Sequence, residues 1–111
     1  MSDYHPDKWV IVKITSKEYP PVHKVFACWL GGYLDGDSWK LNSGITKVNL
    51  VDKNYEFEGS SGSVYYCGIN NYGTNVYGHG VLNNLIDKIE RAGGTCVILP
   101  EETNWLEINY A

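Results

Sequence analysis

Apolar and polar residues alternate with a period of two along the first half of the chain, and this alternation predicts strands. WVIVKI at 9–14 is rich in β-branched residues, which favour extended backbone. VHKVFACWL at 22–30 is apolar at both alternations over its second half. A strand that is apolar on both faces is usually covered on both sides. We therefore expect 22–30 to lie in the centre of a sheet.

Three more strand segments follow, and short turns join them. GITKVNLV at 44–51 and YEFEG at 55–59 flank the turn residues DKN, which predicts a hairpin with a three-residue loop. GSSGS at 59–63 is a second turn, and SVYYC at 63–67 is the next strand. Connections this short indicate an antiparallel meander.

The apolar period changes to that of a helix after residue 80. One helical stripe contains Val81, Leu82, Leu85, Ile86 and Ile89. On the polar face, Asp87 and Arg91 are spaced to pair, and Gly93-Gly94 ends the helix.

Two more strands are expected at the end of the chain, TCVILP at 95–100 and an edge strand at 105–110. The predicted fold is α+β, a mainly antiparallel six- or seven-stranded sheet. One helix from the C-terminal half packs on one face of this sheet, in a single domain over 1–111.

Composition narrows the choice of partners. The net charge is −4, and Arg91 is the one arginine among nine basic residues. Proteins that bind duplex nucleic acid usually carry a basic stripe with arginines, so we do not expect such a partner.

The polar N-terminus and the lack of a long apolar run predict a cytoplasmic protein without a membrane anchor. Cys28, Cys67 and Cys96 each lie in an apolar or aromatic run, which predicts buried free thiols.

Catalytic and metal sites are weakly supported. Cys67 and His79 are twelve residues apart, but a reactive thiol needs a base within hydrogen-bond reach. No two Cys or His residues have the close spacing of structural zinc ligands. DGDS at 35–38 begins like a calcium loop, yet the later oxygen ligands are missing. We therefore expect no enzyme activity, no cofactor and no metal.

Aromatic residues among Gly, Ser and Asn are the strongest functional signal. Such rings give contact area at low entropic cost and can stack on planar ligands. The run NNYGTNVYGHG at 70–80 leads into the helix, whose first N–H groups attract anions. The alternative is that these loops only turn the chain while the rings cover the sheet. The candidate ligand-binding residues are Tyr33, Trp39, Lys40, Ser43, Ser61, Ser63, Tyr72, Tyr77 and His79.

WLGGYLDGDSWKLNSGI at 29–45 and GSSGSVYYCG at 59–68 together resemble a family of small proteins of tailed bacteriophages that has no assigned function. The resemblance extends from about Trp9 to the end of the chain. It implies a phage origin and the cytoplasm of a host cell, and it implies no activity.

Two binding hypotheses follow. In the first, the three loops at 31–44, 59–63 and 70–80 form a pocket that sequesters a small anionic or nucleotide-like immune signal. Proteins that act in this way are commonly homo-oligomers. In the second, an aromatic surface docks on a host protein as an inhibitor or adaptor. An enzyme is the third and least supported hypothesis. The first hypothesis depends on the loops converging in space.

Overall fold

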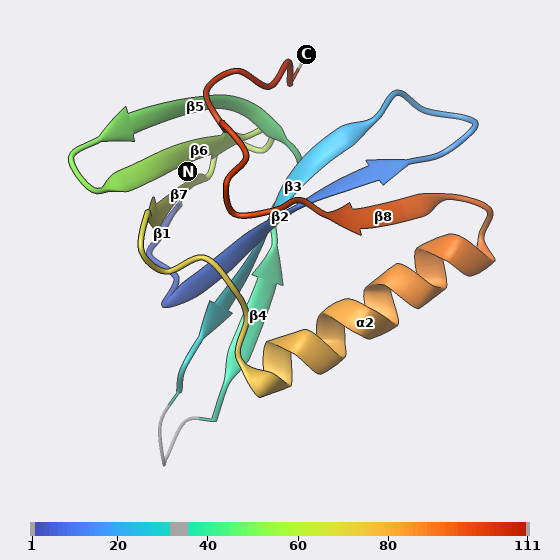
Figure 1. Cartoon of the computed structure of the whole chain (residues 1–111), viewed down its shortest axis with the longest axis horizontal. Helices are drawn as coiled ribbons and strands as arrows, with labels where there is room; N and C mark the ends of the chain where they lie inside the picture. The colour runs from blue at the N-terminus through green and yellow to red at the C-terminus, as the bar shows by residue number, and fades with distance from the viewer. Residues whose placement is uncertain (1, 32–35, 111) are drawn as a thin grey trace.

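A computed structural model describes residues 2–31 and 36–110, and it places eight strands in two four-stranded sheets with one helix in that part of the chain (Figure 1). Sheet I has the order β4 (Ser38–Leu41), β3 (Val22–Trp29), β2 (Lys8–Thr15) and β8 (Thr95–Ile98). Sheet II has the order β1 (Asp3–Tyr4), β7 (Val64–Gly68), β6 (Asn54–Gly59) and β5 (Ile45–Val51). The helix α2 spans Val76–Arg91.

The α+β class and the mainly antiparallel pairing are confirmed, but the expectation of a single sheet is wrong. Strands β1 and β7 form a parallel pair, and the other strand pairs are antiparallel. The chain leaves sheet I after β4 and enters sheet II at β5, through a three-residue turn that ends at Gly44. Gly44 has a φ of 137°, a conformation that favours glycine. This turn directs the second half of the meander into another layer.

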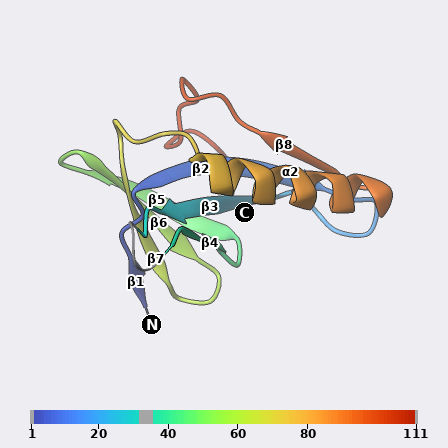
Figure 2. The same ribbon diagram turned by 90° about the horizontal axis from the view of Figure 1, so that it is seen from below.

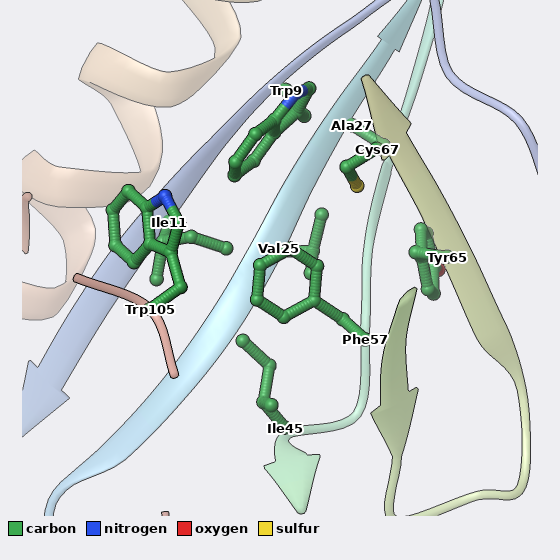
Figure 3. Packing of buried hydrophobic residues seen from close by; sticks show 9 residues of the cluster. All are labelled: Trp9, Ile11, Val25, Ala27, Ile45, Phe57, Tyr65, Cys67 and Trp105. Carbon is green, nitrogen blue, oxygen red and sulfur yellow. The ribbon is translucent and has the colours of Figure 1, made fainter. Parts of the chain in front are cut away.

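Sheet I is the middle layer, with α2 on one face and sheet II against part of the other (Figure 2). The alternation along β3 explains this arrangement. Val25 and Ala27 belong to the core between the sheets, which Figure 3 shows, whereas Phe26 and Cys28 belong to the core beneath α2. The predicted burial of 22–30 on both faces is thus confirmed for this part of the strand.

The predicted edge strand at 105–110 is wrong, because residues 105–108 form a turn and a bend and residues 109–110 have no regular structure. Trp105, Ile108 and Tyr110 of this segment pack against the core beside the two sheets. Trp105 is 2% exposed, and its ring centroid lies 5.8 Å from that of Trp9. The Tyr110 hydroxyl donates a hydrogen bond to the Trp105 carbonyl at 2.7 Å, which folds the tail back on itself. The tail closes one side of the core without forming a ladder.

Several element boundaries also differ from the predictions. Strands β1 and β4 were not expected; β1 has two residues, and β4 has four that are mostly exposed. The β5–β6 loop holds two residues, Asp52 and Lys53, instead of three, because Val51 pairs with Asn54. The helix begins at Val76, inside the expected loop at 70–80.

Other expectations agree with the structure. All three cysteines are free and buried, and Arg91 pairs with Asp87 at 3.0 Å. No helix in the described part of the chain is long and apolar enough to cross a bilayer.

His23 in β3 generates a testable pH dependence. It is 9% exposed, and the Tyr110 ring lies edge-on at 5.3 Å. Burial, with a smaller effect of the Lys13 charge, lowers its pKa below the ordinary 6.5. Below about pH 6.5 the unfolded chain therefore binds more protons than the folded one, and the free energy of unfolding falls as the pH is lowered.

Urea unfolding of wild type and His23→Gln between about pH 7.5 and pH 5.5 measures this loss. We expect H23Q to flatten the pH dependence. The matched control is Asn83→Gln, since Asn83 is exposed in α2 and carries no titratable group, and it should keep the wild-type slope. Equal slopes in H23Q and wild type would contradict the assignment.

Candidate functional site

The start of α2 is the place where two of the predicted binding loops meet. Asn75 is the N-cap, and its side-chain oxygen accepts a hydrogen bond from the Gly78 N–H at 2.6 Å. Its amide nitrogen donates to the Asp37 carboxylate at 3.1 Å. The other Asp37 oxygen accepts from the Gly31 N–H at 3.3 Å. Asn75 therefore joins the segment before β4 to the segment before α2.

Trp39 brings an aromatic ring to the same region. It lies in β4 opposite Cys28 of β3, and its ring stacks on Phe26 at 5.6 Å between centroids. A β-carbon built on Gly78 would clash with the Cys28 sulfur and lie 3.6 Å from the Phe26 ring. The first turn of α2 and Trp39 thus pack on the same two side chains of β3.

Large apolar side chains remain exposed here. Trp39 is 42% exposed, Val76 93% and Tyr77 46%. We call these three residues the helix-start surface. His79 is also exposed and lies in the first turns of α2.

Lys40 lies on the other face of sheet I from Trp39, because neighbouring residues in a strand point to opposite faces. Its ammonium nitrogen sits 5.1 Å from the centroid of the Tyr4 ring in β1. The sequence pattern predicts Trp39 and Lys40 as members of one binding site. Because the two side chains lie on opposite faces of sheet I, they do not form one site.

The three candidate serines occupy a turn-to-turn contact beyond the far end of β4. The Ser43 hydroxyl donates to the Ser61 hydroxyl at 3.2 Å and accepts from the Ser61 N–H at 2.9 Å. The Ser63 carbonyl accepts from the Gly59 N–H at 2.8 Å. These bonds fasten the β6–β7 turn to the segment between β4 and β5. They lie beyond the Leu41 end of β4, whereas the contact with Asn75 lies beside its Ser38 end.

Tyr72 is half-buried and packs against both cores. Its ring stacks on Trp105 at 5.5 Å. Its hydroxyl accepts from the Ile11 N–H at 3.2 Å and donates to the Leu99 carbonyl, so it bridges β2 to the residue after β8. Burial is the main cause that raises its pKa to about 12. Both hydrogen-bonding roles of this hydroxyl are used within the fold.

Trp39, Tyr77 and His79 thus lie on the two segments that the Asn75–Asp37 contact joins, whereas Lys40, the three serines and Tyr72 lie elsewhere. Tyr33 lies outside the described residues. Within the described residues, the candidate side chains of the three loops do not converge on one place.

The catalytic alternative has no supporting geometry. Cys67 is buried between the two sheets, and burial raises the pKa of its thiol. His79 is exposed on α2, on the other side of sheet I. Within residues 2–31 and 36–110, no group of three His, Cys, Asp or Glu residues could hold a metal ion.

A cavity of about 520 Å³ lies at the opposite end of α2, and the sequence reasoning missed it. Ile14 of β2 and Ile89 of α2 contribute apolar surface, and the chain at Gly93-Gly94 borders it. The remaining lining comes from the β2–β3 connection and the helix end, namely Thr15, Ser16, Lys17, Glu18, Tyr19 and Ala92. Two features of the sequence could have indicated this cavity, namely the loop at 16–21, which ends in two prolines, and the paired glycines Gly93-Gly94. None of the predicted binding residues that the structure describes lines this cavity.

Comparisons with known proteins do not name a function. No protein-family model matches the chain, and no curated protein and no solved structure matches it.

Two glycines in α2 provide a matched test of the helix seating. An added β-carbon at Gly78 would lie 2.8 Å from the Asn75 side-chain oxygen and closer still to the Cys28 sulfur. At Gly80 it would meet nothing within 4 Å. We expect Gly78→Ala to lower the free energy of unfolding by about 1–3 kcal/mol through overpacking.

Gly80→Ala should raise that free energy by about 0.5–1 kcal/mol, because alanine favours a helix more than glycine does. Urea unfolding followed by circular dichroism measures both variants. Stabilisation by both substitutions would show that α2 does not pack tightly on β3 at Gly78.

Proposed function

We propose that the chain is a non-enzymatic binding protein that docks on another protein through the helix-start surface. The observation that carries this proposal is the exposure of Trp39, Val76 and Tyr77 at 42%, 93% and 46%. Exposed apolar residues that gather at one place commonly mark contact sites, and Trp and Tyr supply much of the binding energy in protein interfaces.

The seating of these side chains supports the proposal. The Trp39 ring is held by its stack on Phe26 and by the pairing of β4 with β3. Tyr77 is carried by a helix whose first turn is fixed by the Asn75 cap and by close packing at Gly78. Side chains that are already positioned lose less conformational entropy on binding. An exposed aromatic surface of positioned side chains suits a protein partner, whereas a small ligand usually needs a concave site.

The resemblance to phage proteins suggests in which compartment the protein would act and which kind of partner it would bind. A phage protein of this kind would act in the cytoplasm of the host, and its partner would be a host protein that it inhibits or recruits. The packing of Tyr72 within the fold and the separation of Lys40 from Trp39 weigh against the nucleotide pocket.

Substitution at the helix-start surface tests the docking. We expect Trp39→Ala and Tyr77→Ala each to weaken partner binding by about 2 kcal/mol or more, roughly 30-fold in Kd. The measurement is capture from host lysate, followed by titration of the captured protein against each variant.

Leu50→Ala is the matched control, because Leu50 is 47% exposed on β5 in the other sheet. It should bind like wild type. A partner held equally by wild type, W39A and Y77A would overturn the proposed surface.

A second candidate is the sequestration of a small anionic or nucleotide-like ligand beside α2. The contact between Asn75 and Asp37 favours it, since that contact brings two predicted loops together near Trp39, Tyr77 and His79. The Asp37 carboxylate opposes it, because a negative charge there competes with an anion for the helix start.

A thermal-shift panel of cyclic and linear nucleotides distinguishes the two candidates. The docking proposal predicts no shift with any member of the panel, since a ligand that binds only the folded state would raise its stability. A saturable shift that Trp39→Ala abolishes would favour sequestration instead.

A further inference from the structure

The outer edge of β8 differs from the other sheet edges of the molecule. Its sequence is TCVI, without charge or proline, and its register with β2 runs without a shift. Edge strands are usually protected by charges, bulges or shortness. In sheet II, β5 has a register shift between Ile45 and Lys47, and β1 has two residues. In sheet I, β4 carries the exposed Lys40.

The edge of β8 also exposes apolar side chains. Val97 is 53% exposed and Ile98 is 37% exposed. Figure 2 shows β8 as the outermost strand of sheet I, with no other strand beyond it. This combination of an uncharged backbone edge and exposed β-branched residues is typical of strands that pair with another chain.

The ladder between β2 and β8 determines which backbone groups face outward. Leu99 lies opposite Ile11, one step beyond the pair of Val12 and Ile98, and its N–H donates to the Ile11 carbonyl at 2.9 Å. Ile11 and Leu99 are therefore a hydrogen-bonded pair of the antiparallel ladder. Hydrogen-bonded and non-hydrogen-bonded pairs alternate in an antiparallel ladder. The N–H and C=O groups of Cys96 and Ile98 therefore point away from β2. No hydrogen bond within the described residues reaches them from the outer side.

We propose that this edge is a homodimer interface, in which β8 pairs antiparallel with β8 of a second copy about a two-fold axis at Val97. The outward groups determine the register. When Cys96 of one copy lies opposite Ile98 of the other, the N–H and C=O groups of both residues all form hydrogen bonds across the interface, four groups on each strand. Val97 then faces Val97 of the second copy as a close non-hydrogen-bonded pair. The two copies of sheet I become one continuous eight-stranded sheet.

The charges near the two ends of β8 are compatible with this arrangement. Glu101 and Glu102 follow the strand, whereas the end of α2 before the strand carries Lys88 and Arg91 together with Asp87 and Glu90, and Arg91 pairs with Asp87. These four charges cancel, so the acidic end of each copy meets no acidic surplus on the other. The backbone register of the outward groups is what fits a second copy to this edge. The interface uses no residue of the helix-start surface and stands independently of the proposed function.

Cross-linking tests the register. Val97→Cys should form an intermolecular disulfide under mild oxidation with copper phenanthroline, because opposed residues of a non-hydrogen-bonded pair bring their β-carbons close together. Leu50→Cys is the matched control, since Leu50 is 47% exposed on the edge strand β5. It should remain monomeric on a denaturing gel. Equal cross-linking of both variants would overturn the assignment of the interface.

Sedimentation over a range of concentrations tests the dimer itself. We expect wild type to associate reversibly and Val97→Lys to weaken association by more than about tenfold, because like charges would face each other at the axis. Leu50→Lys should associate like wild type, and circular dichroism checks that both variants are folded. A wild type that stays monomeric at its highest soluble concentration, or a dimer that V97K leaves intact, would overturn the proposal.

Discussion

The fold depends on the need of β2 and β3 to be covered on both faces. Val10, Val12, Phe26 and Cys28 require a cover on one side, and α2 supplies it with Leu82. Trp9, Ile11, Val25 and Ala27 require another cover, and sheet II and the tail supply it with Phe57 and Trp105. Because apolar surface must leave water on both sides of one hairpin, a single sheet with one helix would be insufficient. The three layers follow from this one pair of strands.

Much of this architecture can be predicted from local patterns. The apolar alternation of 22–30 correctly places β3 in the middle of a sheet, since both of its faces read as apolar. The helical stripe correctly identifies the buried face of α2, where Leu82 is fully buried. The division into two sheets could not be predicted, because it depends on the turn at Gly44 and on long-range pairing. The 105–110 segment is not a strand although Leu106, Ile108 and Tyr110 alternate with Glu107 and Asn109 as in one. Its side chains pack individually, and the Tyr110 hydroxyl bonds back to Trp105.

The candidate site could be predicted less well, and Tyr72 shows why. Its neighbours are Asn71 and Gly73, which are typical of a surface loop. Yet its ring lies against Trp9 and Trp105, and its hydroxyl spans the gap between β2 and the residue after β8. Sequence neighbours describe the local backbone, whereas a long side chain can reach a core formed by distant segments. Trp39 and Tyr77 could be selected from the same signal because their strand and helix leave them exposed.

The long connection between β2 and β8 has a consequence for how the chain assembles. Strands β2, β3 and β4 follow one another, as do β5, β6 and β7, but β8 reaches β2 only after all of them and α2. Loop closure over such a distance slows folding, and the edge of β2 stays open in the meantime. Three residues separate α2 from β8, so the two elements travel together. When the protein refolds at high concentration, α2 and β8 of one chain can pack on the open edge of β2 in another chain. The protein concentration then determines whether the chain folds as a monomer or as a domain-swapped dimer.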